Sequence, residues 1–403
     1  MCQQPNLFLK KIIWILVGLL PVWILGCGGG AQGGVTAPAG WTRALPFGFP
    51  TPLVPDSNLI TEAKIELGRH LFYDVRLSGS GTQSCSSCHQ QFRAFTNGQV
   101  TAIGSTGDVL PRNVPTLGNV AYYASYTWAN YGLSTLERHH QVPLFVDHPI
   151  ELGVNDLNII DIQNQIFSDP IYISLFNAAF PGQIAYSDRF SWPNITHALA
   201  SFTRSLITGN SKYDQSLRGQ ASLSPEEYRG MALFNGEKAK CSHCHSGFNF
   251  TDSVNYEGLT SVTYPFHNTG LYNIDGVGSY PAPNRGIFEL SAKPSDMGAF
   301  RAPTLRNIEV TAPYMHDGSK PTLESVIEHY AAGGTVLQLP DPNAGDGRAN
   351  PYKDALIGPI DLTAQDKADL VAFLKTLTDQ DFLTDPCLGN PWYPDPARPC
   401  LKK

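Results

Sequence analysis

Two copies of one pentapeptide constrain this chain more than any other feature. Cys85–His89 and Cys241–His245 both read C-x-x-C-H, the pattern in which two thiols bond covalently to haem and the adjacent histidine binds its iron. With 8 Cys and 11 His in 403 residues, one chance copy is expected about 0.004 times. A zinc ribbon would need two C-x-x-C pairs about 15–20 residues apart, whereas these lie in different halves of the chain. We therefore expect two c-type haems, attached through Cys85, Cys88, Cys241 and Cys244, with His89 and His245 as proximal iron ligands.

The N-terminus predicts export from the cytoplasm. Lys10 and Lys11 precede an apolar run, Ile12–Leu25, which is too short for a membrane span and typical of a secretory signal. The run leads into Gly26 and Cys27, a pattern similar to the bacterial lipobox, so lipid on Cys27 would anchor the chain to a membrane. An ordinary cleaved signal is the alternative. Because c-type haem attachment also takes place outside the cytoplasm, we expect a lipid-anchored protein on the periplasmic side of the envelope, at the outer membrane.

Each half of the chain contains one haem motif, preceded by a similar helical phrase. Glu66–Phe72 and Tyr228–Phe234 both place a glycine before an apolar pair that ends in phenylalanine, which indicates a duplicated cytochrome unit. Further helices are expected over 191–211, from Ser224, and over 362–376. Without sustained period-2 alternation, the expected fold is mainly α, with two cytochrome-c-like haem domains, long loops and few short strands. The predicted divisions are a signal peptide 1–26, a flexible linker 27–45, haem domains 46–212 and 213–380, and a Pro-rich tail 381–403.

Charge and the remaining cysteines narrow the functional classes. The chain has 28 Lys and Arg against 35 Asp and Glu, for a net charge of −7, so a nucleic-acid surface is not expected. Once the four haem-motif cysteines and the lipidated Cys27 are assigned, Cys387 and Cys400 remain. An oxidising compartment favours a disulfide between these two.

Several ordered motifs around the two haem sites resemble the bacterial di-haem cytochrome c peroxidase and MauG superfamily. The resemblance covers residues 46–380. Its carriers are Leu67–Asp74, Arg76–Ser78, Arg112–Leu117, Pro149–Gly153, Phe300–Asn307 and Thr311–Gly318.

Two departures from conventional peroxidases resemble MauG instead. Such peroxidases carry a distal histidine in the loop after the first haem, but residues 95–112 contain none, which implies an open first iron. At the distal ligand position of the second haem, the resemblance gives Tyr330 in place of methionine. A tyrosinate would favour ferric and higher-valent iron. Met315 is the main rival, followed by Tyr314, Met297 and His329.

The resemblance also implies an electron relay and an acid-base group. Trp128 occupies the position of the tryptophan that relays electrons between the haems, with a purely structural core role as the alternative. Glu151 falls in the motif that supplies the distal carboxylate, where it would handle the protons of peroxide cleavage. His139 replaces the nearby glutamine of relatives, and either His139 or His140 could assist. Arg301 and His316 are candidate partners of the haem propionates.

A calcium ion lies between the haems in related structures. By resemblance, the residues that supply its oxygen ligands correspond to Asn113, Thr311 and Pro313 in this chain. Oxygen atoms are the ligands that calcium prefers.

The favoured function is a hydrogen-peroxide-using oxidoreductase that stores two oxidising equivalents across its haems and oxidises residues of a periplasmic or secreted partner protein. Ala129-Asn130-Tyr131 replaces the Asp-Gly-Arg of many relatives, and with Leu144-Phe145 and His329–Gly334 it resembles the MbnH-like branch, whose members oxidise a tryptophan of a secreted partner. A cytochrome c peroxidase supplied by a small redox protein is the first alternative. A plain electron-transfer cytochrome is the second.

Overall fold

The computed structural model of the chain describes residues 41 and 43–400. The predicted signal peptide and the lipidated Cys27 lie outside the described residues. The contacts of the described residues group them into one unit. Among the described residues, no helix has the length and apolar character needed to cross a membrane.

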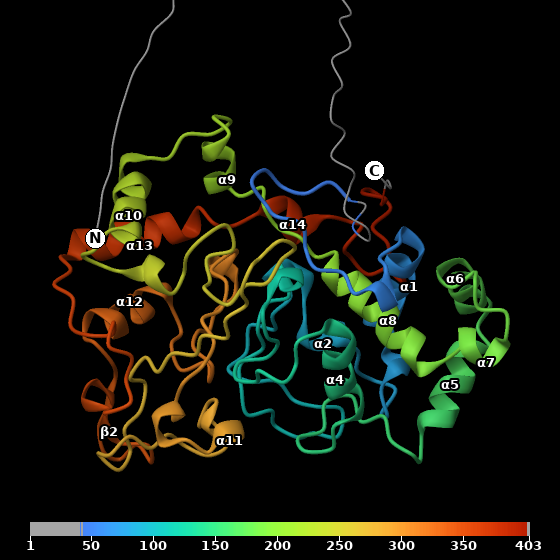
Figure 1. Cartoon of the computed structure of the whole chain (residues 1–403), viewed down its shortest axis with the longest axis horizontal. Coiled ribbons are helices and arrows are strands. Elements are labelled where there is room, and N and C mark those ends of the chain that lie inside the picture. Colours follow the sequence, from blue (N-terminus) through green and yellow to red (C-terminus); the bar gives the residue numbers. More distant parts are fainter. Residues whose placement is uncertain (1–40, 42, 401–403) are drawn as a thin grey trace, which may run out of the picture. The chain divides into compact units, whose positions relative to one another are not determined.

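The described part is mostly helical with one short strand pair, as the sequence predicted (Figure 1). The helices of the first half are α1 (Glu62–Tyr73), α2 (Cys85–Cys88), α3 (Leu136–His139), α4 (Gln141–Phe145), α5 (Ile159–Phe167), α6 (Pro170–Ala179), α7 (Tyr186–Arg189) and α8 (Trp192–Arg204). Those of the second half are α9 (Lys212–Leu217), α10 (Pro225–Asn235), α11 (Phe288–Ser291), α12 (Leu323–Ala331), α13 (Ala364–Lys375) and α14 (Gln380–Thr384). Strands β1 (Val336–Leu337) and β2 (Gly345–Asp346) pair antiparallel, with Val336 opposite Asp346.

Local capping explains where the long helices begin. Ser224 accepts a hydrogen bond from the backbone N–H of Glu227, whose side chain bonds back to Ser224, and Pro225 fills the first turn of α10. Thr363 and Asp366 form the same reciprocal pair at α13. Helix α8 ends at Arg204 and not at Ser211, and nearly all of its residues from Asn194 onward are buried. The expected connecting helix is therefore a shorter, central one.

Two helix pairs form the framework on which the haem motifs are mounted. Helix α1 packs against α8, and α10 packs against α13 (Figure 1). A Cβ atom on Gly68 would overlap the carbonyl oxygen of Ala198, and one on Gly230 would overlap that of Asp369. Each glycine thus allows two helix backbones to touch at their crossing.

The buried apolar side chains form separate clusters. The largest draws on α1, α8 and the first haem motif, and includes Phe72, Phe95 and Phe202. A second contains Phe234 and Phe373, from α10 and α13. A third surrounds Trp128. The domain limits at 212/213 and 380/381 stay a prediction.

Both ends of the packed chain join the first cluster. Trp41 is 4% exposed and packs there, so the packed part of the chain begins before the end of the predicted linker. Phe382, Leu383 and Leu388 enter the same cluster from the opposite terminus. The predicted disulfide between Cys387 and Cys400 is confirmed, with an S–S distance of 2.07 Å.

Candidate di-haem site

The first haem motif begins in α2 and presents a histidine whose orientation is fixed. The Nδ1 atom of His89 lies 2.6 Å from the carbonyl oxygen of Phe95. Because a carbonyl only accepts, Nδ1 carries the hydrogen and Nε2 remains available for a metal. Burial lowers the pKa of His89 to about 4, so the imidazole is neutral, as an iron ligand must be.

The second motif repeats this arrangement from a short 3-10 turn, Cys241–His243. Nδ1 of His245 lies 3.1 Å from the carbonyl oxygen of Phe250. Phe95 and Phe250 both have positive φ, 63° and 50°, and each follows its histidine closely. All four motif cysteines are unpaired thiols. Each motif therefore presents two thiols and one free imidazole nitrogen for the attachment of a haem.

The space beside the second motif fits a haem. A cavity of about 230 Å³, lined mostly by apolar side chains, contains Cys241, Cys244 and His245 in its wall. Two buried cationic or polar groups face the cavity without hydrogen-bond partners, namely Nη1 of Arg301 and Nε2 of His316. Such groups suit the propionates of a haem, since a buried unpaired donor is otherwise costly.

The two leading candidates for the second axial ligand share this cavity. Tyr330 and Met315 both line it, as does Tyr314. The hydroxyl of Tyr314 donates to the carbonyl oxygen of Ile308 at 2.9 Å, which occupies it. Burial raises the pKa of Tyr330, so its phenol is neutral until a cation displaces the proton. The choice between Tyr330 and Met315 stays a prediction.

The remaining rivals are placed elsewhere. Met297 packs in the cluster around Trp128, and Nδ1 of His329 lies 2.7 Å from Oγ1 of Thr335. Neither belongs to the described lining of the cavity.

Glu151 lies near the first haem motif. Burial raises the pKa of its carboxyl to about 7, and its charge acts on both Cys85 and Cys88. A close backbone approach holds the segment, because a Cβ atom on Gly104 would overlap the carbonyl oxygen of Ile150. The backbone N–H of Ser105 also donates to the carbonyl oxygen of Glu151 at 2.7 Å. A carboxyl group that titrates near neutral pH suits proton transfer.

The two adjacent histidines of the first half have different surroundings. His140 is occupied, with Nε2 3.0 Å from Oγ1 of Thr203 on α8. His139 stacks on Tyr126, and its Nδ1 is buried without a partner. Burial and the nearby His89 lower the pKa of His139 to about 4. His139 is thus the histidine with a free nitrogen near the first motif.

Trp128 lines the cavity of the second motif, and both its indole ring and its backbone form hydrogen bonds. Its Nε1 donates to the carbonyl oxygen of Asn113 at 2.7 Å, and its own carbonyl oxygen accepts from the backbone N–H of Arg301 at 2.9 Å. The side chain is 8% exposed and packs with Phe300. The predicted relay residue therefore connects the chain segments that follow the first motif to the wall of the second.

The predicted calcium ligands share one wall. Asn113, Thr311 and Pro313 all line the cavity. Asn113 also donates from its side chain to the carbonyl oxygen of Gln99 at 2.8 Å. Calcium at this place stays a prediction.

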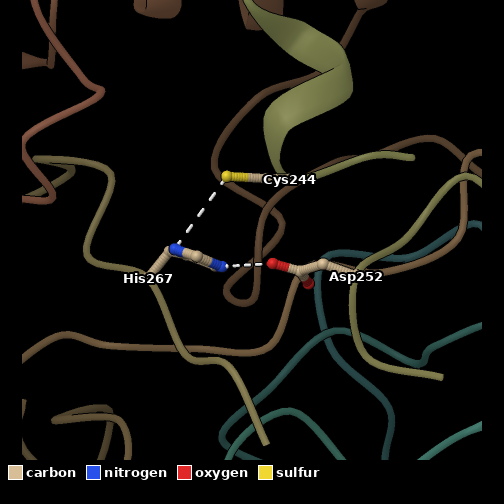
Figure 2. Close-up of side chains that lie close together, drawn as sticks. All are labelled: Cys244, Asp252 and His267. Carbon is tan, nitrogen blue, oxygen red and sulfur yellow. Dashed lines mark hydrogen bonds and ion pairs between the residues drawn. The ribbon is translucent and has the colours of Figure 1, made fainter. Parts of the chain in front are cut away.

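Sequence reasoning missed a charged cluster at the second motif. Nε2 of His267 lies 2.7 Å from Oδ2 of Asp252, and its Nδ1 lies 2.6 Å from Oδ2 of Asp354. Figure 2 shows His267 between Asp252 and Cys244, whose Sγ is 3.9 Å from Nδ1. The hydrogen bond with Asp252, followed by that with Cys244, raises the pKa of His267 to about 11. These residues are far apart in the sequence, so no spacing signals the cluster.

Cys244, Asp252 and His267 are close enough to hold a metal ion. The carboxylates already bind the imidazole, however, and the thiol belongs to a haem attachment motif. We interpret the cluster as a charged support of the second haem.

Two C-x-x-C-H motifs with oriented histidines, on a mostly helical framework, define a di-haem c-type cytochrome. Residues 62–222 match the family described as di-haem cytochrome c peroxidase. Methylamine utilization protein MauG of Methylorubrum extorquens is 31% identical over 324 residues, which cover 80% of this chain and 80% of the relative. Cytochrome-c peroxidase IdrP1 of a Pseudomonas species is 33% identical over 369 residues, 86% of this chain and 89% of the relative. The chain belongs to the di-haem cytochrome c peroxidase family, which includes MauG.

Solved structures agree with this assignment. The crystal structure of a MauG-like protein associated with microbial copper homeostasis is 49% identical, with a TM-score of 0.85, and covers 88% of this chain and 100% of its own. The di-haem peroxidase BthA of Burkholderia thailandensis, at 22% identity and a TM-score of 0.61, shares the fold. The predicted family, the haem c cofactors and a peroxidase-type oxidoreductase activity are thereby confirmed.

Proposed function

We propose that the protein uses hydrogen peroxide to oxidise residues of a partner protein, as the MauG and MbnH-like branches do. The observation that carries the proposal is the asymmetry of the two haem pockets. The first has the carboxyl of Glu151 nearby and no histidine in residues 95–112, whereas the second contains Tyr330 and Met315 as potential sixth ligands. An open iron reacts with peroxide, while a six-coordinate iron only transfers electrons.

The roles of the side chains follow from their surroundings. When bound, the haems supply the redox chemistry by accepting the two oxidising equivalents of peroxide. Glu151 would take a proton from hydrogen peroxide and return it to the departing oxygen, since its pKa of about 7 allows both steps. His139 assists through its unpaired Nδ1. The balance requires two electrons from the partner and two protons, and peroxide leaves as two water molecules.

Trp128 provides the path for those electrons. Its indole is buried in the wall of the second cavity and hydrogen-bonded to Asn113, within the segment after the first motif. An aromatic ring fixed in this position would shorten each electron step between the two haems when they are bound. Replacing Trp128 by phenylalanine should therefore slow partner oxidation while leaving the reaction with peroxide intact.

A cytochrome c peroxidase is the second candidate, favoured by the 33% identity to IdrP1 over most of both chains. Two measurements on the ferric holoprotein distinguish the candidates. Electron paramagnetic resonance should show one high-spin and one low-spin haem before any reduction. One equivalent of peroxide, added without donor, should then oxidise two equivalents of ferrocyanide added afterwards. Two low-spin signals and no recovered oxidant would overturn the proposal.

We also propose that the mature protein is a lipoprotein on the periplasmic side of the envelope, with its lipid on Cys27. The support is the apolar run after Lys10 and Lys11 and the Leu-Gly-Cys sequence that ends it. Cells given labelled palmitate should label the protein, and Cys27→Ala should release it into the soluble periplasmic fraction. An unlabelled protein that stays at the membrane would contradict this.

A further inference from the structure

A second cavity opens at the surface next to the charged cluster of the second haem. It has a volume of about 510 Å³ and is lined by Tyr131, Tyr264, Phe266, Tyr352, Asp296 and Asp354 among others. We call it the tyrosine cavity. Tyr131 and Tyr264 are 47% and 42% exposed, and none of the three tyrosine hydroxyls has a hydrogen-bond partner among the described residues. Tyr131 and Tyr264 thus leave part of their rings accessible to a ligand.

The unpaired charge in the described lining of the tyrosine cavity is negative, because Asp354 is paired with His267 and Asp296 is not paired with a cation. Asp296 has only a weak contact, 3.4 Å, from the hydroxyl of Ser295, so its carboxylate lacks a cationic partner in the described structure. No lysine or arginine belongs to the described lining. Lys353, next to Tyr352 in the sequence, directs its Nζ to the carbonyl oxygens of Gly333 and Arg348. Electron-rich aromatic faces beside an unpaired carboxylate attract cations.

The tyrosine cavity also lies close to the second haem. Asp354 is part of its wall and bonds to His267, while His267 is part of the wall of the haem cavity and contacts Cys244 (Figure 2). Tyr131 follows Trp128 by three positions. A ligand held here would therefore be separated from Cys244, which would carry the second haem, by one carboxylate and one imidazole.

We propose that the tyrosine cavity binds a lysine or arginine side chain of the protein that the haems oxidise, and so docks that protein beside the second haem. The inference rests on the proposed function, because that function requires a protein partner whose electrons enter the haems. The cationic side chain serves as an anchor and is not itself oxidised. A neighbouring aromatic residue of the partner would lose two electrons and two protons to one hydrogen peroxide, which leaves as two water molecules, and the haems, when bound, would carry those electrons.

A short peptide tests the cavity without any turnover. The probe is acetyl-Gly-Ser-Lys-Ser-Gly-amide, and its counterpart with N-ε-acetyllysine lacks the charge. Binding to the resting ferric holoprotein should broaden the lysine ε-methylene proton signals through the paramagnetic iron, and added salt should weaken the effect. The acetylated peptide should show no broadening. Because no peroxide is used, failure of this test is distinguishable from failure of the proposed function.

Paired variants assign the binding to the cavity. Asp296→Asn and Tyr264→Ala should each weaken binding about threefold, as expected for a partly exposed ion pair and a cation–π contact. Tyr264→Phe retains the aromatic face and should bind like the unaltered protein. Asp156→Asn removes the same charge from an exposed position in the first half of the chain and should have no effect. Equal binding by Asp296→Asn and Asp156→Asn, or equal broadening of both peptides, would overturn the proposal.

Discussion

Gly68 touches the backbone of Ala198 so closely that a Cβ atom would lie less than 3.0 Å from the carbonyl oxygen. Gly230 has the same relationship to Asp369, and the next residue met is a phenylalanine in both places, Phe202 and Phe373. The helix crossing that supports the first haem motif is therefore repeated, contact for contact, beside the second.

We expect Gly68→Ala and Gly230→Ala each to destabilise the protein. At a helix position alanine is more stable than glycine by about 1 kcal/mol. The added methyl group, however, overpacks a rigid helix crossing, which costs about 1–3 kcal/mol or more. Urea unfolding followed by haem absorbance measures the change. Gly182→Ala is the matched control, because a Cβ atom there meets nothing within 4 Å. If the helical variants are as stable as this control, the helix pairs must be able to separate without cost.

Part of this framework could be predicted from the sequence. The repeated phrases around Gly68 and Gly230 and the C-x-x-C-H motifs are local patterns, so they signal both helices and both haems. The partners of the two glycines could not be predicted, because Ala198 and Asp369 carry no pattern that marks a crossing. The carbonyl groups that orient His89 and His245 are backbone atoms, placed by the left-handed conformations of Phe95 and Phe250. Phenylalanine has no preference for such a conformation, so the sequence does not predict it at either position.

His267 shows why ion pairs between residues that are distant in the sequence cannot be predicted from it. Its two carboxylate partners come from segments on either side of it. The hydrogen bond with Asp252, followed by those with Cys244 and Asp354, raises its pKa to about 11. The imidazole is therefore positively charged throughout the physiological range. Its ion pairs stabilise the fold fully below its ordinary pKa of 6.5, and that contribution is lost as the pH rises through about 11.

We expect His267→Gln to lower the reduction potential of the second haem. Removing a positive charge near the thioether destabilises the reduced iron relative to the oxidised iron. A destabilisation of about 1 kcal/mol lowers the reduction potential of this one-electron couple by about 40 mV. Spectroelectrochemical titration of the holoprotein gives the potential. His243→Gln changes a histidine that belongs to the motif itself but is more exposed, and it should shift the potential far less. Equal shifts in the two variants would show that His267 has no special influence.

The C-terminal tail should contribute measurably to stability. The disulfide between Cys387 and Cys400 closes a short loop, and Trp392 within that loop donates to the carbonyl oxygen of His70 at 3.1 Å. Replacing both cysteines by serine should cost about 3 kcal/mol, the usual effect of a loop of this length. Thermal unfolding and limited proteolysis would report it. A variant cleaved no faster than the unaltered protein would mean that the Trp392 contact alone holds the tail.

The sixth ligand of the second haem can be decided by two substitutions. We expect Tyr330→Phe to abolish the low-spin ferric signal in electron paramagnetic resonance, because it removes the phenol oxygen and retains the ring. Met315→Leu removes the competing sulfur from the same cavity and should leave that signal unchanged. The opposite pattern would identify Met315 as the ligand. Haem content, measured as the pyridine haemochrome, confirms that both variants are fully loaded.

The reaction with peroxide should depend on the ionisation of Glu151. Its carboxyl has a pKa of about 7 because it is buried, well above the ordinary 4.5. Only the carboxylate accepts a proton, so the rate constant for peroxide should rise as the pH increases through about 7. Glu151→Gln should lower that rate constant by about 10²–10⁴-fold, the range for loss of a general base, and remove the pH dependence. Stopped-flow absorbance of the haem measures both effects.

Stability provides an independent check on the same carboxyl group. A folded pKa above the unfolded value means that the folded state favours the protonated form, so Glu151 costs stability increasingly as the pH rises from about 4.5 to 7. Glu151→Gln removes this cost. The variant should therefore unfold at higher urea concentration than the unaltered protein at pH 8 and at the same concentration at pH 4. Equal stability at both pH values, together with an unchanged rate constant, would place the acid-base group elsewhere, and His139→Gln would be the next variant to measure.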